Sequence, residues 1–383
     1  MPPRFTNPFR YGDLALDEAF TDRDEEIAEL KADIRNGQNV VIFAPRRFGK
    51  SSLVWRATQE LLARNEVLVA QIDLMATPSK EKLADKLAKS IYEDIATVVF
   101  RARQKAMSIF TGLQITPRIS LDPIDGSLSF SFEASSRKED IDATLEKLFE
   151  LPAQLSADRK ERCALVIDEF QEILDIDPRL LPLMRSVFQR QPEVAHVYLG
   201  SKRSMMEKIF NDVNEPFWRS AKRIELGLID PQHFAPFIKE RFDSTDRGID
   251  DEVVEGVLEI TRGHPYGTQE LCYFLWEEVS EGRIAHGTEL ETALTKVLRS
   301  ENAHFTRIWT KAAKSHRLVL QALAEEPVEH ISDEYRRKHG LPIDATVRKA
   351  LKVLIEDEIV VRDASGYRIG EPFLAEWIRR YSS

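Results

Sequence analysis

The sequence predicts an α/β fold in which a mostly parallel sheet carries helices on both faces. Five apolar runs of strand length occur along the chain, and segments of helical periodicity separate most of them. The first run leads into "FAPRRFGKSS" at residues 43–52, which has the composition of a phosphate-binding loop. A third observation, short helices followed by a hairpin near the C-terminus, predicts a separate small domain.

The expected elements follow in chain order. A first helix should begin near Thr21 and Asp24, which resemble a capping box, and end at Gly37. The strand "NVVIFA" then leads into the loop, and "SLVWRATQELLAR" continues as a helix. The sheet is expected to be mostly parallel because helical segments lie between most strands. The other strands are expected at 67–74, 163–170, 196–201 and 223–229.

One insertion, at about 113–135, interrupts this rhythm. Polar and apolar residues alternate on either side of Asp125-Gly126, which predicts a β-hairpin that could serve as a docking surface or as mere decoration. After Pro231 the pattern is helical until about residue 310. We therefore expect three domains. They are a core at 1–230, a helical lid at 231–308 and a winged helix-turn-helix at 309–383.

Composition excludes several classes of protein. A formal charge of −10 argues against general coating of nucleic acid, although it permits a local basic face. Cys163 and Cys272 lie in apolar runs and are expected to be buried hydrophobic side chains rather than a disulfide or metal pair. No signal core and no apolar run of membrane-spanning length is found, so a cytoplasmic location without membrane contact is expected.

The loop has the order that phosphate binding requires: a strand, a bend with inward-facing N–H groups, and a helix N-terminus. A lysine then reaches the outer phosphates and a hydroxyl binds Mg²⁺. Ala44 replaces the usual first glycine, where smallness matters more than positive φ. A Gly-Lys-Ser triplet also arises by chance, but the flanking strand and helix favour a nucleotide site. The candidate residues are Pro45, Arg46, Arg47, Phe48, Gly49, Lys50, Ser51 and Ser52. The phosphate argument leaves Arg46 and Arg47 unexplained; they could face a partner or a neighbouring subunit.

Two carboxylates end the strand "ALVID". Asp168 is expected to hold Mg²⁺ through water, because this metal prefers oxygen ligands, with Ser51 supplying the hydroxyl. Glu169 is expected to orient or deprotonate the attacking water, which favours ATP hydrolysis over phosphorylation of a small molecule. The alternative is a pair of acids that only ends a strand.

Two further candidates lie at later strands. Ser201, with Lys202 in reserve, ends the strand-like "HVYLGS" and could sense the γ-phosphate, or could simply be a polar residue leaving a strand. Arg219 precedes the last strand, near Lys222 and Arg223, and could act as an arginine finger in a ring of subunits. A solvated basic edge is the alternative.

Several segments in this order resemble the prokaryotic, largely archaeal P-loop ATPase family of the AAA/STAND type. They are "NPFRYG", "FAPRRFGKSSL", "VIDEFQEI", "LGSKRSMMEKIF", "RGHPYGTQEL" and "EPFLAEWIRR". The resemblance spans essentially the whole chain and extends, more distantly, to origin-recognition-type initiators. It implies a core of the AAA/ASCE type that binds ATP or ADP with Mg²⁺, a helical lid and a C-terminal winged helix.

The lid departs from the initiator pattern, which has Gly-Asp-x-Arg where this chain has Gly263, His264, Pro265 and Tyr266. Without that arginine the lid resembles the Gly-x-Pro type of STAND switch proteins, whose proline packs near adenine. This implies a slow ATP/ADP switch, although His-Pro is also an ordinary start of a helix.

The resemblance also places Phe20 to Arg23 over the base, with Phe9 and Tyr11 as weaker candidates.

The C-terminal unit reads as three helices and a hairpin, the order of a winged helix. In its third helix Val347, Leu351, Leu354 and Ile355 form the expected buried stripe. The outward residues Arg348, Lys349 and Lys352, with Arg362 and Arg368 on the wing, could contact DNA. Because acids at 356–358 follow that helix, docking of a protein or autoinhibition remains open.

The sequence thus predicts an Mg²⁺-dependent ATPase acting as a nucleotide switch, with Glu169, Lys50, Ser201 and Arg219 as catalytic candidates. The alternative is a DNA-binding regulator whose nucleotide is mainly structural. A small-molecule kinase is a weaker reading, and oligomerisation is left open.

Overall fold

The computed structural model describes residues 6–12, 20–96, 115–121, 128–134, 138–363 and 366–382. The chain divides into two compact units, which are described separately below. The sheet unit comprises Arg23–Arg46 and Lys50–Leu226, and the helical unit comprises Met1–Asp22, Arg47–Gly49 and Gly227–Ser383.

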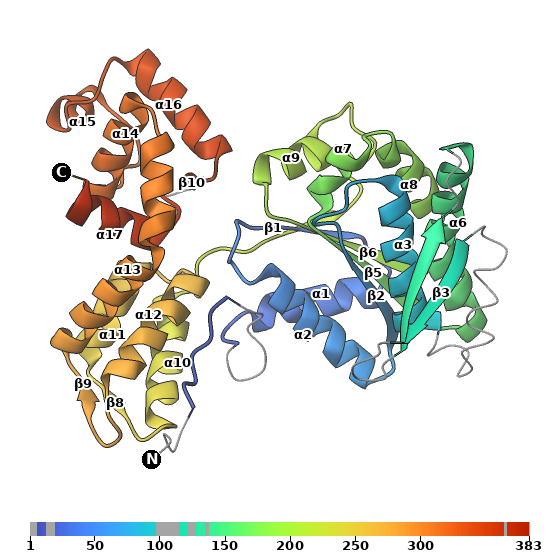
Figure 1. The fold of residues 1–383 in the computed structure, drawn as a ribbon, viewed down its shortest axis with the longest axis horizontal. Helices are drawn as coiled ribbons and strands as arrows, with labels where there is room; N and C mark the ends of the chain where they lie inside the picture. The colour runs from blue at the N-terminus through green and yellow to red at the C-terminus, as the bar shows by residue number, and fades with distance from the viewer. Residues whose placement is uncertain are drawn as a thin grey trace. The chain divides into compact units, whose positions relative to one another are not determined.

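The described part of the sheet unit contains a five-stranded parallel sheet in the order β2-β5-β6-β1-β7. Its strands are β1 (Val40–Phe43), β2 (Val67–Asp73), β5 (Arg162–Asp168), β6 (Val194–Gly200) and β7 (Lys222–Glu225). The strand that precedes the loop, β1, therefore lies between β6 and β7, while β5 is separated from it by β6 (Figure 1). The predicted α/β class with a parallel sheet is confirmed.

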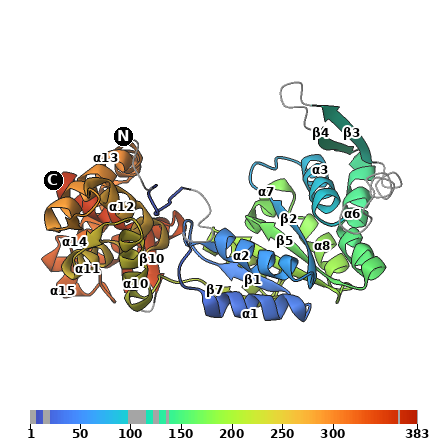
Figure 2. The same cartoon turned by 90° about the horizontal axis from the view of Figure 1, so that it is seen from below.

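Helices cover both faces of this sheet, as expected (Figure 2). The helices α1 (Asp24–Arg35) and α2 (Lys50–Ala63) lie on one face, and α3 (Lys80–Ser90), α6 (Lys138–Arg159) and α8 (Leu180–Phe188) lie on the other. The strands β1 and β6 are buried along their whole length, and since successive side chains point to opposite faces, both faces need to be covered. The remaining elements here are the π-helix η2 (Ile91–Ala96), the 3₁₀-helix η3 (Phe170–Glu172), α7 (Ile173–Ile176) and α9 (Arg203–Asn211).

Two local predictions at element ends are wrong. The capping box at Thr21 does not form, since the N-cap of α1 is Arg23, which has φ 73 and makes no side-chain cap. The strand expected at 223–229 ends at Glu225, and only one further N–H, that of Leu226, bonds to β1, at 3.1 Å from the Phe43 oxygen. The predicted end of α1 is confirmed, because Gly37 adopts φ +72 directly after the C-cap residue Asn36.

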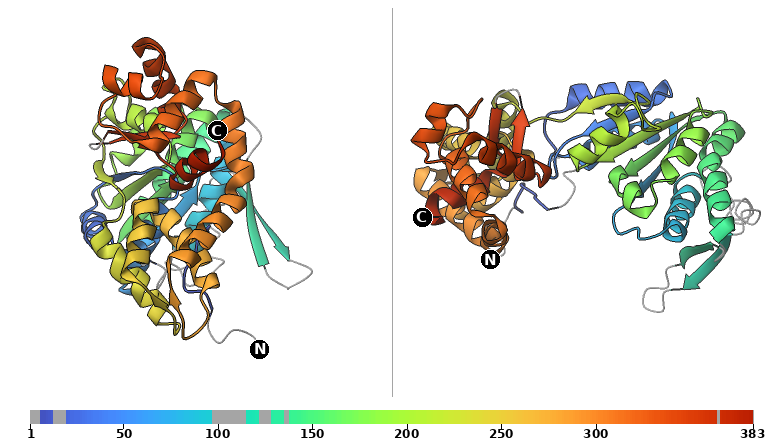
Figure 3. Two further views of the ribbon diagram at one scale, coloured as in Figure 1. Left: turned by 90° about the vertical axis from the view of Figure 1, so that its left-hand side faces the viewer. Right: turned by 90° about the horizontal axis from the view of Figure 1, so that it is seen from above.

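The predicted hairpin forms from β3 (Ile115–Leu121) and β4 (Leu128–Ala134), which pair antiparallel with Ile119 opposite Phe130. It extends away from the sheet as a two-stranded ribbon (Figure 3). The predicted turn residues Asp125-Gly126 lie outside the described residues.

The helical unit begins with four helices: α10 (Pro231–Asp243), α11 (Asp251–Thr261), α12 (Pro265–Glu278) and α13 (Gly287–Lys311). The wholly helical pattern expected here is wrong in one detail. Two residues of β8 (Gly248–Ile249) pair in parallel with two of β9 (Ile284–Ala285).

The last part of the chain has the helices and hairpin of the predicted winged helix. They are α14 (Lys314–Glu325), α15 (Asp333–Lys338), α16 (Asp344–Glu356), β10 (Val360–Asp363), β11 (Gly366–Ile369) and α17 (Pro372–Tyr381). One core cluster contains Leu298 of α13, Leu351 of α16 and Trp377 of α17. The expected boundary at 308/309 falls inside α13 and stays a prediction.

Both cysteines are free and buried, as expected. Among the described helices, none has the length and apolar character needed to cross a membrane.

Candidate functional site

The loop after β1 owes its bend to Gly49. Its φ of +82 lies in the left-handed region, which strains any residue with a Cβ. Ala44 is buried and is not among the residues with positive φ, so alanine is tolerated at the position of the first glycine. As expected, residue 44 requires a small side chain but not positive φ, whereas residue 49 has positive φ and favours glycine.

Lys50 opens α2 and closes the loop. Its ammonium is buried and donates to the backbone oxygens of Ala44 at 2.7 Å and Pro45 at 2.9 Å. These bonds keep the cation at the mouth of the bend, where a lysine of this kind meets phosphate oxygens. Ser52, two residues after Lys50, is one of the buried residues of α2.

Ser51 and Asp168 meet at the carboxyl edge of the sheet. The Ser51 hydroxyl donates to Oδ2 of Asp168 at 2.8 Å, and the Glu169 N–H donates to Oδ1 at 2.8 Å. Burial raises the pKa of Asp168 despite these donors. Adjacent hydroxyl and carboxylate oxygens are suitable ligands for Mg²⁺. No group of three or more His, Cys, Asp or Glu residues suited to a metal occurs in the described ranges, so such an ion would take further ligands from phosphate and water.

Glu169 is held ionised beside this pair. Its backbone has φ 50, and its Oε2 accepts from the Ser201 hydroxyl at 2.7 Å and from the Gln171 amide. Burial opposes the charge, but the bonds from Gln171 and Ser201 and the positive charges of Lys50 and Arg46 outweigh it and lower the pKa of Glu169. A carboxylate in this state is ionised near neutral pH, so it can accept a hydrogen bond from a water molecule and orient it.

Gln171 was not singled out from the sequence, although it is completely buried and fixes Glu169. The only available signal was its spacing, two residues after Glu169, at the start of a turn. Ser201 directly follows β6, the strand that adjoins β1, so it lies where the sequence placed it. The reserve candidate, Lys202, forms an ion pair with Glu172 at 2.9 Å.

The basic cluster at the start of β7 consists of Arg219, Lys222 and Arg223, and two of these form ion pairs within the sheet unit. Lys222 pairs with Glu29 and Asp33, each at 2.9 Å, and Arg223 pairs with Glu225 at 2.7 Å. These side chains stabilise their own unit. Arg219 is exposed, with its guanidinium 5.0 Å from the centre of the Trp218 ring.

Two tip residues of the loop belong to the helical unit. The guanidinium of Arg47 lies 3.6 Å from Oε2 of Glu371 and 4.2 Å from the centre of the Tyr266 ring. Phe48 packs edge-to-face on His264, with 4.8 Å between the ring centres. Arg47, which the phosphate argument left unexplained, therefore has an acidic partner in its own chain.

The predicted residues around the base have mixed outcomes. His264 is the N-cap of α12, where Nδ1 accepts from the Gly267 N–H at 3.1 Å, and Pro265 is the first residue of that helix. Burial lowers the pKa of His264 to about 3, so its ring is neutral. Arg23 is buried and pairs with Glu26 at 2.9 Å, whereas Phe20 is partly exposed.

The weaker candidates for the base are engaged elsewhere. Phe9 is only 1% exposed and packs 5.4 Å from the Phe242 ring, so the suggestion that it closes over a base is wrong. Tyr11 packs 5.8 Å from the Tyr266 ring.

The basic candidates of the winged helix differ in exposure: those on α16 are exposed, whereas Arg368 on β11 is buried. Arg348 and Lys352 are exposed but pair with Asp344 at 2.8 Å and Glu356 at 3.9 Å. Lys349 is also exposed, as expected. The placement of Arg368 on the wing surface is wrong, because this side chain lies on the inner side of β11 and the residue is only 9% exposed.

Comparisons with known proteins agree with this geometry. Residues 20–271 match a family described as an ATPase domain predominantly from Archaea, and residues 303–380 match a probable winged helix domain. The chain belongs to this ATPase family. No curated protein matches the sequence.

Two solved structures share the fold. A Walker-type ATPase of Pyrococcus abyssi is 16% identical with a TM-score of 0.64, and the match covers 95% of this chain and 97% of that one. The ORC2 protein of Aeropyrum pernix, solved in ADPNP–ADP complexes, is 14% identical with a TM-score of 0.53 over 97% of each chain. The expected P-loop ATPase fold with a C-terminal winged helix is confirmed.

Proposed function

We propose that the protein is a slow, Mg²⁺-dependent ATP switch of the STAND type, whose ATP or ADP state is transmitted to a partner. The observation that carries this proposal is the pair of bonds Ser51–Asp168 and Ser201–Glu169 at one edge of the sheet, beside Lys50. A hydroxyl, a metal-binding carboxylate and an ionised base are thereby brought next to a phosphate-binding loop.

Each residue of the site has a distinct role in this proposal. Backbone N–H groups from Pro45 to Gly49 and the start of α2 would hold the phosphates, and Lys50 would neutralise their outer charge. Ser51 and Asp168 would hold Mg²⁺, which supplies positive charge against the phosphate oxygens when bound. Glu169 would orient the attacking water and accept its proton.

Three further assignments complete the site. Ser201 would sense the γ-phosphate, since its hydroxyl already bridges β6 to Glu169. The exposed Arg219 would act on the nucleotide of a second copy if the protein assembles. Phe20, Arg23, His264 and Pro265 would surround the base.

Coupling to a partner is assigned to the winged helix. We propose three domains at 1–230, 231–308 and 309–383, with a lid that closes on ATP and a C-terminal domain that reports this state in the cytoplasm. Residue 266 is a tyrosine where initiator-like relatives have an arginine. This supports a slow switch rather than a fast motor, because the side chain lacks the positive charge that would stabilise a transition state.

The test is steady-state ATP hydrolysis by the full chain with Mg²⁺, with Glu169→Gln as the blank. We expect turnover to fall about 100-fold or more in this variant, because a positioned general base contributes about that much. Lys50→Ala should weaken ATP binding. Unchanged ATP affinity in Lys50→Ala would contradict the assignment of the loop, and turnover equal in wild type and Glu169→Gln would contradict that of the base.

A second function, a DNA-binding regulator with a structural nucleotide, is favoured by one observation. Arg348, Lys349 and Lys352 are all exposed on α16. Binding of duplex DNA should then weaken as salt increases and be lost in Arg348→Glu/Lys349→Glu. Absence of duplex binding at low salt would exclude this function. The existing pairs with Asp344 and Glu356 offset part of the basic charge.

A further inference from the structure

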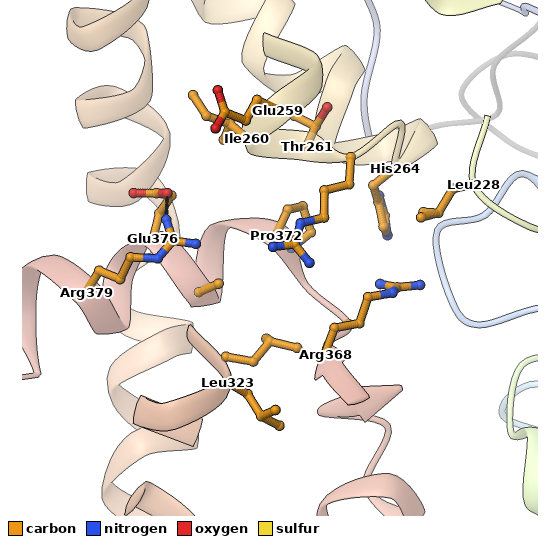
Figure 4. Close-up of a pocket in the computed structure, with 14 residues that line it drawn as sticks. Leu228, Glu259, Ile260, Thr261, His264, Leu323, Arg368, Pro372, Glu376 and Arg379 are labelled. Atoms are coloured by element: carbon orange, nitrogen blue, oxygen red, sulfur yellow. Dashed lines mark hydrogen bonds and ion pairs between the residues drawn. The ribbon is translucent and has the colours of Figure 1, made fainter. Parts of the chain in front are cut away.

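A pocket of about 310 Å³ lies within the helical unit (Figure 4), but His264, which the proposed function assigns to the base, forms part of its wall. The sheet unit contains a polar side chain without such an assignment, that of Gln171, which is 0% exposed. Phe170 before it and Ile173 two residues after it are both buried in the core of this unit. The Phe170 ring packs 4.7 Å from the Tyr198 ring. The core therefore fixes the turn on either side of Gln171.

The amide of Gln171 faces two carboxylates. Its Nε2 donates to Oε2 of Glu169 and, at a longer 3.5 Å, to Oε1 of Glu172. The opposite orientation of the amide would direct its carbonyl oxygen at these acceptors, so the nitrogen must be the atom on this side. The Gln171 Oε1 is buried and has no hydrogen-bond partner in the described ranges. A buried oxygen without a partner lowers stability, so the packing of the turn does not by itself explain an amide here.

Glu169 uses its two carboxylate oxygens differently. The Gln171 amide and the Ser201 hydroxyl both donate to Oε2, the second at 2.7 Å. Within the described residues, no hydrogen bond reaches Oε1 of Glu169. The terminal torsion of a glutamate is otherwise broad, and donors from two different elements restrict it. One oxygen is thereby held by the protein, and the other is left for water.

A second contact ties the same two turns together. Lys202 directly follows Ser201 after β6, and its Nζ donates to Oε1 of Glu172 at 2.9 Å. This oxygen is also the more distant acceptor of the Gln171 amide. The ammonium offsets the charge of Glu172, which would otherwise add to that of Glu169 beside the amide. Ser201 and Lys202 therefore hold the turn after β5 at two points, and Gln171 is bonded to the acid at each of them.

We propose that Gln171 is a positioning residue for ATP hydrolysis, which holds Glu169 so that Oε1 meets the attacking water, and that Glu172 and Lys202 hold Gln171 in turn. The inference rests on the proposed role of Glu169 as the base. Gln171 acts through that carboxylate alone, so its removal should affect turnover and not the binding of ATP. A fixed orientation matters because a misplacement of about 1 Å can lower a rate by about 100-fold. Burial raises the pKa of Glu169, and the bond from Gln171 is the largest of the effects that lower it.

The test is Gln171→Met, measured as ATP affinity and as turnover with Mg²⁺ from pH 5 to pH 9. Methionine is close to glutamine in length and volume and suits a buried site, but it has no N–H group. We expect unchanged ATP affinity and about fivefold lower turnover at pH 8, because the Ser201 hydroxyl that remains can rotate and does not hold the ionised carboxylate in one orientation. At pH 5 the loss should be roughly threefold larger again, because the pKa of Glu169 rises without the donor. A role in packing alone would change neither the ratio of turnover to affinity nor the acid limb.

The sheet unit provides a matched control in Gln191, a second buried glutamine. Its residue is 6% exposed, its Nε2 donates to the backbone oxygen of Phe149 at 2.9 Å, and its Oε1 also lacks a partner in the described part of the chain. Gln191→Met thus removes the same group from a similar environment, but one bonded to a backbone oxygen rather than to Glu169. Its turnover and acid limb should equal those of the wild type. Equal turnover and equal acid limbs in Gln171→Met and Gln191→Met would overturn the proposal, whatever the change in stability.

The outer pair is tested with variants that leave the core intact, since both side chains are partly exposed. Glu172→Gln and Lys202→Met should each lower turnover about twofold, the size expected for such an ion pair, with ATP affinity unchanged. Weaker ATP binding in Lys202→Met alone would mean that Lys202 meets the phosphate, and would overturn the role given to the pair. Unchanged turnover in both variants would overturn it as well, also if Gln171→Met does not fold.

Failure of this inference differs from failure of the proposed function. If Glu169→Gln loses turnover while Gln171→Met keeps it, Glu169 is the base and Gln171 does not position it. If Glu169→Gln keeps full turnover, the base is wrongly assigned and both proposals fall together.

Discussion

Two glutamates, the partly buried Glu169 in the sheet unit and the buried Glu270 in the helical unit, have opposite electrostatic environments. Glu169, at the edge of the sheet, accepts hydrogen bonds from Ser201 and Gln171, and its pKa is lowered. Glu270, in the middle of α12, is 1% exposed, and neither of its carboxylate oxygens has a hydrogen-bond partner in the part of the chain that the structure describes. Burial, together with the charges of Glu301 and Glu371, raises the pKa of Glu270 to about 8, although Arg47 acts in the other direction.

The difference shows that burial alone does not determine the state of a carboxyl group. Strand ends and tight turns bring free hydroxyl and amide donors to Glu169, because their side chains are not needed for regular packing. Along α12 the backbone N–H groups are already used within the helix, and the near acidic neighbours add repulsion. The first glutamate is held in its ionised form, while the second stays protonated at neutral pH and lowers stability as pH rises.

The largest effect is expected from Glu270→Gln, which replaces the glutamate whose carboxylate oxygens have no hydrogen-bond partner in the described residues. The native pKa of Glu270 is raised above its usual 4.5, so the native state holds its proton more tightly than the unfolded state. The wild type should therefore lose stability, relative to the variant, as pH rises from about 4.5 to about 8. The difference in the free energy of unfolding should reach on the order of a few kcal/mol at higher pH. Urea unfolding of both proteins from pH 5 to pH 9 measures it.

Glu277→Gln provides the control, since Glu277 is exposed on the same helix. Its difference from the wild type should stay small across the pH range. A difference between wild type and Glu270→Gln that did not change with pH would contradict the assignment.

A smaller effect is expected from Ser201→Ala, which removes the hydroxyl that donates a hydrogen bond to Glu169. Without this bond the pKa of Glu169 should rise, so the loss of ATP hydrolysis on the acid side should begin at higher pH. We expect hydrolysis to fall several-fold (roughly threefold or more) at pH 5 and little at pH 8, because a hydrogen bond to a charged group is worth about 1.5–3 kcal/mol and Glu169 stays ionised at high pH in both proteins. Rates of hydrolysis from pH 5 to pH 9 give the profile.

Ser204→Ala is matched to this change, as it removes an exposed serine three residues further on. An acid limb at the same pH in wild type, Ser201→Ala and Ser204→Ala would show that Ser201 does not tune Glu169.

The smallest effect belongs to a carboxylate that water already solvates. Asp344 pairs with Arg348 at 2.8 Å on the outside of α16, where the Arg348 side chain is 79% exposed. Arg348→Ala should change the free energy of unfolding by less than about 0.5 kcal/mol. Thermal unfolding at low and high salt measures this change. If Arg348→Ala changed the free energy of unfolding by more than Glu270→Gln does, exposure to solvent would not explain the difference between these carboxylates.

Much of the geometry of the candidate ATP site could be predicted because its signals are local. Gly49, Lys50 and Ser51 are adjacent, and Asp168 and Glu169 end an apolar run, so periodicity and turn chemistry were enough to place them. Errors arose where a local pattern had no tertiary partner. Thr21 did not cap α1, and the strand predicted to reach 229 stopped once its neighbour β1 ended at Phe43.

The sequence by itself determined the order of strands, loop and helices, the residues at the strand ends, and the winged-helix pattern. Tertiary structure alone decided that Gln171 fixes Glu169, that Arg47 meets Glu371, and that Arg368 turns inward beside Arg262. The reason is one of range. Backbone preferences and hydrophobic periodicity act over a few residues, whereas these contacts depend on which side chains the folded chain brings together and on whether each buried charge finds a partner there.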